Sequence, residues 1–227
     1  MAIGYSGFMS VPIRPAATLL LLRDGPEGPE VWLMERSRGV AFMAAAWVFP
    51  GGRVDAEDEA AGASLGELGA FRAAALRELA EEADILIDPS HPLTIWAHWI
   101  TPEIETRRYD TWFFAAALPE GQVARVDGSE GVAGAWFRPS DALDRYEQGA
   151  LALAPPTLRT LQELAPYRTV AEALSASRRT PPICPRFAME DADTAWVLLP
   201  GDPDFPADEA VDPPTRFRFA VGRWWAR

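Results

Sequence analysis

Runs and alternations of apolar residues predict a chain in which strands and helices are mixed from end to end. Segment 16–37 reads as two strands joined by a Gly/Pro turn, and 46–49 is a short apolar strand that ends at Pro-Gly-Gly. Further strands are expected at 94–100, 109–118, 134–139, 195–200 and 216–222. Helices are expected at 71–83, 140–150, 155–165 and 169–177. No linker divides these elements, so we expect one α/β domain over 1–227 with a helical addition at about 140–178.

The helix expected at 71–83 carries three glutamates close together. Glu78, Glu81 and Glu82 stand at spacings of i, i+3 and i+4, where like charges repel by roughly 0.2–0.5 kcal/mol per pair on an exposed helix. A solvated acidic face is one explanation. The other is a cation site, because clustered carboxylates bind hard cations, and Mg²⁺ completes its shell with water and phosphate oxygens.

The remaining residues of this helix favour the cation site. Leu79 and Ala83 lie nearly opposite the acidic face when the helix is projected at 100° per residue. Ala74 and Ala75 flank the acidic face, where bulkier side chains would obstruct a ligand. Arg77 precedes Glu81 by four positions, so the two can pair and fix that carboxylate.

Charge and composition narrow the classes of partner. The formal net charge of −12 over 227 residues repels nucleic acid backbones, so no nucleic-acid partner is expected. The apolar run 16–22 is too short to span a bilayer and lacks the basic segment of a signal peptide, so no membrane partner is expected. The single cysteine, Cys184, cannot form an internal disulfide. We therefore expect a cytoplasmic protein.

The hexapeptide 77–82, Arg-Glu-Leu-Ala-Glu-Glu, resembles the R-E-U-x-E-E core of the Nudix box, where U is a bulky aliphatic residue. Gly52, preceded by Phe-Pro-Gly, matches the glycine that opens this box, whose full pattern is G-x5-E-x7-R-E-U-x-E-E-x-G-U. The resemblance implies a Nudix-type α/β/α sandwich with a central mixed sheet and a loop–helix–loop metal site, to which this chain adds late helices.

The chain departs from the Nudix box at three points. Arg77 follows Gly52 by 25 positions where the pattern has 14, which implies an 11-residue insertion at about 56–69. The early glutamate is displaced, since Asp58 stands six positions after Gly52 whereas Gly69 stands eight before Arg77. Asp84 replaces the late glycine. The insertion could be a lid over the substrate or a tolerated surface excursion.

Longer stretches resemble the branch of the Nudix family that contains the mammalian peroxisomal acyl-CoA diphosphatase. These stretches are 47–55, 71–118, 135–143 and 154–165. A second coenzyme A branch carries the motif L-L-T-x-R-S…G-x-V-x-F-P-G-G, which the chain matches in part, at Leu33, Arg36, Ser37 and 49–52. Coenzyme A or an acyl-CoA is therefore the preferred substrate, cleaved to 3′,5′-ADP and (acyl-)4′-phosphopantetheine.

The resemblance also implies roles for individual residues. Glu78, Glu81 and Glu82 would bind Mg²⁺ or Mn²⁺, and Arg77 would orient them, with Arg77, Glu78 and Glu82 as catalytic residues. The general base would be Glu78 or an acidic residue from a loop, such as Glu103, Glu105 or Glu130. Gly51 and Gly52 would let the backbone approach the phosphates closely. Arginines could hold the phosphates or form surface ion pairs; the candidates are Arg36, Arg38, Arg107 and Arg108.

Two alternatives to coenzyme A hydrolysis are compatible with the sequence. The enzymatic alternative is another small nucleoside diphosphate derivative, namely ADP-ribose, a dinucleotide or a nucleotide sugar. The alternative of another class is a non-catalytic Nudix-fold module that senses a nucleotide, although a module that only binds need not keep three mutually repelling glutamates. Because many relatives form dimers, a homodimer is one expectation for the assembly.

Overall fold

The computed structural model describes residues 11–37, 45–126, 131–190, 194–202, 205, 216–220 and 223–226. Arg38 and Glu130 lie outside the described residues. The strands are β1 (Ile13–Gly25), β2 (Gly28–Arg36), β3 (Trp47–Val48), β4 (Gly51–Arg53), β5 (Thr94–Ile100), β6 (Arg108–Ala117), β7 (Gly131–Phe137), β8 (Pro182–Ile183), β9 (Arg186–Met189), β10 (Ala195–Leu198), β11 (Arg216–Ala220) and β12 (Arg223–Ala226). The helices are α1 (Ala56–Gly62), α2 (Gly69–Ala83), α3 (Pro139–Glu147), α4 (Pro155–Leu164) and α5 (Val170–Ser175).

Strand β1 is the centre of a mixed eight-stranded sheet with the order β3-β2-β1-β6-β5-β8. It forms the predicted hairpin with β2 at its C-terminal end and runs parallel to β6 along Ile13–Leu22. Nearer its N-terminus it pairs with the three-residue strand β4, and β7 pairs with β2. Strand β1 thus pairs with β2, β4 and β6, and its pairing with β4 positions the Pro-Gly-Gly turn.

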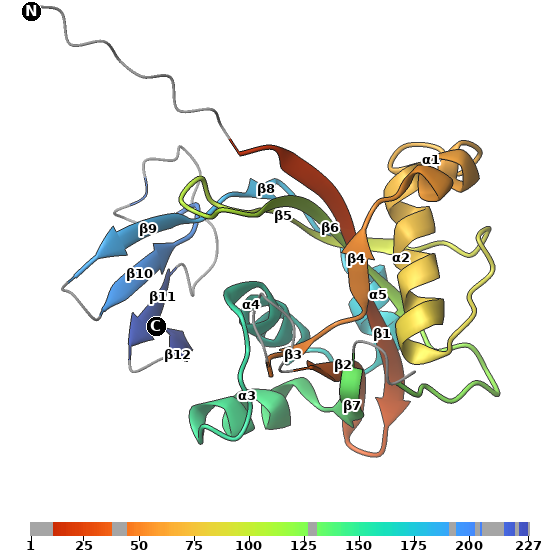
Figure 1. Cartoon of the computed structure of the whole chain (residues 1–227). Helices are drawn as coiled ribbons and strands as arrows, with labels where there is room; N and C mark the ends of the chain where they lie inside the picture. The colour runs from red at the N-terminus through yellow and green to blue at the C-terminus, as the bar shows by residue number, and fades with distance from the viewer. Residues whose placement is uncertain are drawn as a thin grey trace, which may run out of the picture.

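Alternation along β1 divides the interior into two layers, one on each face of the sheet. Leu19 and Leu21 point to one face, where α2 packs, whereas Leu20 and Leu22 point to the other. The second face is covered by α3, α4 and α5, whose apolar residues join the same buried cluster as Leu20 and Leu22. Figure 1 shows α2 and the α3–α4 pair on opposite sides of the strands. The predicted α/β/α sandwich with a mixed sheet and late helices is confirmed.

A second, four-stranded antiparallel sheet, β12-β11-β10-β9, follows the late helices. It lies next to β5 and β8 of the main sheet (Figure 1, left). Val197, Leu199 and Phe217 are buried in the cluster that also contains the apolar face of α4. One domain over 1–227 stays a prediction. Among the described residues no helix is long and apolar enough to cross a membrane.

Several local elements differ from the sequence-based expectation. The inserted segment at about 56–69 contains the seven-residue helix α1, which is not among the expected helices. The short strands β4, β8, β9 and β12 were not predicted either. Helices α3 and α4 begin with a proline in the first turn, after Arg138 and Ala154. Proline suits this position because its fixed φ is helical and it lacks the N–H that would be left without a partner.

Helix α2 is rotated relative to the expected arrangement. Ala74 and Ala75, expected beside an open acidic face, are fully buried against the sheet. Glu82 is buried on this same face, whereas Glu81 is exposed. Small residues let the helix approach the sheet closely, and Glu82 thereby comes within reach of the strand backbone. The three glutamates therefore differ in environment rather than sharing one exposed surface.

The burial of α2 predicts a large difference between two leucines. Leu79 is fully buried and Leu86, just after the helix, is 72% exposed. Leu79→Ala should lower the free energy of unfolding by about 2–5 kcal/mol, because it leaves a cavity between helix and sheet. Leu86→Ala should change it by less than about 0.5 kcal/mol. Urea unfolding followed by tryptophan fluorescence measures both, and equal losses would contradict the assigned packing.

Candidate active site

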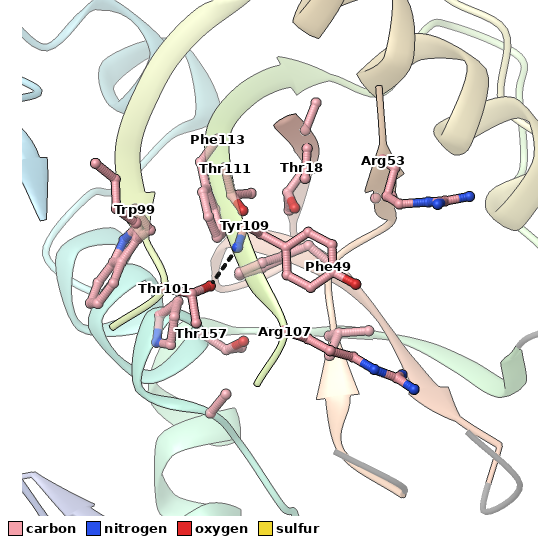
Figure 2. Close-up of a pocket in the computed structure, with 18 of the residues that line it drawn as sticks. Thr18, Phe49, Arg53, Trp99, Thr101, Arg107, Tyr109, Thr111, Phe113 and Thr157 are labelled. Atoms are coloured by element: carbon pink, nitrogen blue, oxygen red, sulfur yellow. Dashed lines mark hydrogen bonds between the residues drawn. The ribbon is translucent and has the colours of Figure 1, made fainter. Parts of the chain in front are cut away.

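A cavity of about 700 Å³ opens where β4, β1, β6 and β5 meet the N-terminus of α4 and the second sheet. Glu78 and Glu81 line it from α2, and Gly51 and Gly52 line it from β4. Figure 2 shows Thr18, Thr111 and Phe113 projecting from the strands that form its floor. Phe187 and Val197, from β9 and β10, contribute a further wall.

One row of residues crosses the floor of this cavity from strand to strand. Arg53 of β4 pairs with Ala16 of β1, Ala16 pairs with Thr111 of β6, and Thr111 pairs with Trp99 of β5. Residues paired in this way face the same side of a sheet, and all four line the cavity. Figure 2 shows Arg53 and Trp99 at opposite sides, with Thr111 between them.

The guanidinium of Arg77 organises the acidic end of the site. Its Nε and Nη2 donate to the two carboxylate oxygens of Asp58, at 3.0 and 2.9 Å. Its Nη1 donates to Glu78 Oε1 at 2.9 Å and to Glu81 Oε2 at 3.0 Å, and Nη2 also donates to the backbone oxygen of Arg53. The hydrogen bond to Asp58 and the charge of Glu78 raise the pKa of Arg77 above its ordinary value. The guanidinium is therefore charged at any pH at which the protein is folded.

Asp58 occupies the place of the early acid in the Nudix box. It is only 2% exposed, and besides Arg77 it accepts a hydrogen bond from the backbone N–H of Asp55, in a capping box at the start of α1. The inserted residues therefore follow Asp58 rather than preceding it. Gly62 of α1 and Gly69 of α2 lie backbone to backbone, with no room for a side chain between them. Residues 56–69 lie outside the described lining of the cavity, which favours the tolerated surface excursion over the lid.

The Pro-Gly-Gly turn contacts two of the three glutamates. The backbone N–H of Gly51 donates to Glu82 Oε2 at 2.8 Å, which explains how a carboxylate can be buried under the sheet edge. A Cβ on Gly52 would collide with the carboxylate of Glu78, and a Cβ on Gly51 would collide with the backbone of β1. Close approach of the backbone thus requires glycine at position 51, whereas a side chain at position 52 would displace the carboxylate of Glu78.

The helix exit tolerates the replacement of the late glycine. Asp84 has φ 55° and ψ 36°, the left-handed conformation, and its N–H donates to the carbonyl of Ala80. Glycine is the usual residue in this conformation, and aspartate is one of the few others that adopt it readily. The substitution therefore leaves the C-terminal turn of α2 intact.

The acidic side chains suit a hard divalent cation in donor chemistry. Glu78, Glu81 and Glu82 offer carboxylate oxygens, which Mg²⁺ and Mn²⁺ prefer. The backbone of Gly52 faces the Glu78 carboxylate and carries no side chain that would fill this space. Within the described part of the chain, no three such side chains converge as ligands of one ion. Instead, Arg77 bridges Glu78 and Glu81, whereas Glu82 contacts Gly51.

The candidate phosphate-binding arginines differ in whether they line the cavity. Arg36 and Arg107 line the cavity. Arg108 is buried and donates to the carbonyl of Thr101, outside the described lining. Of the candidate loop bases, Glu105 lines the cavity and Glu103 does not.

Sequence reasoning did not identify most of the residues that line the cavity, among them Arg53, Trp99, Phe187 and Val197. Arg53, next to the Gly-Gly pair, could have been found from its position in the turn. Trp99, Phe187 and Val197 carry no local signal, because they lie on two separate sheets that meet at the cavity only in the folded chain.

The two glycines predict contrasting effects of the same substitution. Gly51→Ala should lower the free energy of unfolding by about 1–3 kcal/mol, since the new Cβ meets backbone that cannot move freely. Gly52→Ala should change it by less than about 1 kcal/mol, because the Glu78 side chain can rotate away, but it should lower the hydrolytic rate. Thermal unfolding and product assays test both effects. A stable Gly51→Ala variant would show that the strand pairing is wrong.

The bidentate contact of Asp58 predicts its contribution to stability. Asp58→Asn weakens two charge-assisted hydrogen bonds to Arg77 and should lower the free energy of unfolding by about 1.5–3 kcal/mol. Glu59→Gln removes the same charge from an exposed position of α1 and should change it by less than about 0.5 kcal/mol. Both are measured by urea denaturation, and indistinguishable midpoints would refute the assigned pairing.

Known proteins resemble this chain in sequence and in structure. Human acyl-coenzyme A diphosphatase NUDT19 is 26% identical over 288 aligned positions, which cover 83% of this chain and 76% of the human protein. The Gallus gallus protein of the same name is 25% identical over 307 positions, covering 86% and 80%. The crystal structure of a Nudix hydrolase from Alicyclobacillus acidocaldarius superposes with a TM-score of 0.67 at 25% identity, over 75% of this chain and 99% of that protein.

The NUDIX domain family model matches residues 12–157. This range contains the Pro-Gly-Gly turn, Asp58, the Arg77 cluster and the floor of the cavity. The chain therefore belongs to the Nudix family and is a pyrophosphohydrolase.

Proposed function

We propose that this chain hydrolyses the diphosphate of coenzyme A or an acyl-CoA, releasing 3′,5′-ADP and (acyl-)4′-phosphopantetheine. The observation that carries the proposal is one cavity lined by carboxylates and arginines together with aromatic and aliphatic side chains. The similarity to a human protein named acyl-coenzyme A diphosphatase, over 83% of this chain, supports the same substrate.

The acidic end of the cavity would hold the catalytic cation. Glu78, Glu81 and Glu82 would bind Mg²⁺ or Mn²⁺, which supplies charge neutralisation at the diphosphate and lowers the pKa of bound water. Arg77 fixes the orientation of Glu78 and Glu81 through its hydrogen bonds, and Asp58 fixes Arg77 in turn. Glu78 is the preferred acceptor of the proton from the attacking water, with Glu105 as the loop alternative, because both line the cavity.

Arginines would bind the remaining phosphate charge. Coenzyme A carries a 3′-phosphate besides its diphosphate, so it needs more cationic contacts than a simple diphosphate. Arg36, Arg53 and Arg107 line the cavity and are suited to this role. Arg108 would act indirectly, since its bond to the Thr101 carbonyl closes the base of the loop that carries Arg107.

The proposed metal site predicts the effect of removing single charges. Glu78→Gln and Glu82→Gln should each lower turnover of coenzyme A by about 100-fold or more, because each removes an oxygen donor to the cation at the reacting diphosphate. Glu59→Gln, which removes one negative charge from the nearby surface of α1, should retain turnover within about twofold. Initial rates with Mg²⁺ or Mn²⁺ give the comparison, and circular dichroism verifies that each variant is folded.

A substrate panel separates the proposal from its alternatives. Coenzyme A, acyl-CoA, ADP-ribose, NADH and nucleotide sugars are incubated with the protein and either metal, and the products are resolved by chromatography. Release of 3′,5′-ADP is expected. Turnover of ADP-ribose or a nucleotide sugar without turnover of coenzyme A would reject the substrate, and full activity of both glutamine variants would reject the mechanism. Tight binding without any turnover would identify a sensor.

A further inference from the structure

The two sides of the cavity differ in chemistry along the row that crosses its floor. At the β4 side stand Arg53, Glu78 and Glu81, whereas at the β5 side stands the ring of Trp99. Adjacent strands are about 4.8 Å apart, so three strand spacings separate Arg53 from Trp99 by roughly 14 Å. A ligand that contacts both Arg53 and Trp99 must therefore be elongated.

The side beyond Trp99 is completed by the second sheet. Val197 of β10 pairs directly with Phe187 of β9, so the two side chains leave the same face of that sheet, and both line the cavity. Ala154, at the start of α4, adds a further apolar surface. Phe187 and Val197 lie beyond the residues 12–157 that match the NUDIX domain, so the part of this wall formed by the second sheet lies outside the matched range.

The indole of Trp99 offers only apolar surface to a ligand. Its Nε1 is buried and has no hydrogen-bond partner among the described residues, so the ring edge that carries this atom is turned away from the opening. Val197 is almost fully buried and Phe187 is partly exposed. Trp99, Phe187 and Val197 offer a ligand no accessible side-chain donor, so this wall favours an aliphatic group, while the hydroxyl-bearing Thr101 and Thr157 line the cavity beside Trp99.

We propose that Trp99, Phe187 and Val197 form the subsite for the acyl group of the substrate, so that the second sheet determines acyl selectivity. This inference rests on the proposed coenzyme A diphosphatase activity. The diphosphate lies at Glu78, and the extended arm crosses the sheet. A chain with two amide units, comparable to about four extended residues, spans roughly 14 Å, which matches the width of the floor and brings the thioester to the apolar wall.

The test measures selectivity rather than activity alone. The ratio of kcat/KM for octanoyl-CoA to kcat/KM for free coenzyme A is determined for the wild-type chain and for two variants. Val197→Trp fills the wall and Phe187→Ala removes its largest surface, and each should lower the ratio about tenfold, since a few methylene contacts are lost. Met189→Ala changes a 67% exposed side chain of β9, the strand of Phe187, that lies outside the described cavity lining, and it should leave the ratio unchanged.

The outcomes distinguish failure of this inference from failure of the proposed function. If the folded wild-type chain turns over neither coenzyme A nor any acyl-CoA, both are overturned. If it turns over these substrates but both variants keep the wild-type ratio, only the acyl subsite is overturned. A variant that loses the same factor in kcat/KM for free coenzyme A and for octanoyl-CoA also keeps the ratio, so it counts against the acyl subsite. Phe187→Ala alone decides the matter if Val197→Trp does not fold.

Discussion

The guanidinium of Arg77 is the contact on which the acidic end of the site depends. Glu78 and Glu81 carry like charges on adjacent turns of α2. The positively charged guanidinium of Arg77 lies between them and donates a hydrogen bond to each, which offsets their repulsion. The guanidinium is held in its turn by the buried carboxylate of Asp58, which belongs to a different helix. The site is therefore assembled from α1, α2 and the turn after β3, and none of these segments could position it alone.

Close backbone approach is the second constraint, and it explains the composition around the site. Ala74 and Ala75 bring α2 against the sheet, and the backbone N–H of Gly51 donates a hydrogen bond to the buried carboxylate of Glu82. The tight fit connects packing to chemistry, since the contact that buries α2 also fixes the depth at which its carboxylates lie. A bulkier residue on this face would separate the helix from β4 and the glutamates from the cavity.

The sequence predicted those parts of the site that depend on local pattern. The hairpin, the helix 71–83 and the Arg77–Glu82 core follow from periodicity and motif, and the structure brings them together. The rotation of α2 could not be predicted in this way, because the 100° projection shows which residues share a face but not which face meets the sheet. The spacing of the motif did not place the early acid, because position 58 has the expected distance from Gly52 and position 69 the expected distance from Arg77. The hydrogen bonds between Asp58 and Arg77 place it at position 58. Trp99 belongs to the main sheet, whereas Phe187 and Val197 belong to the second sheet, about 90 to 100 residues later in the chain; they come together only where the two sheets meet at the cavity, which leaves no trace in any short window.

The contact of Gly62 with Gly69 has a consequence for how this region can change in length. The two backbones touch, so residues 63–68 leave and return at almost the same point, and the geometry of Asp58 and Arg77 is set on the inner side of that junction. Closing a somewhat longer or shorter loop costs only a fraction of a kcal/mol per few residues, since the entropy of closure grows with the logarithm of length. Insertions at 63–67 therefore cost little free energy of folding, and this stretch is a natural attachment point for a peptide tag or a reporter domain.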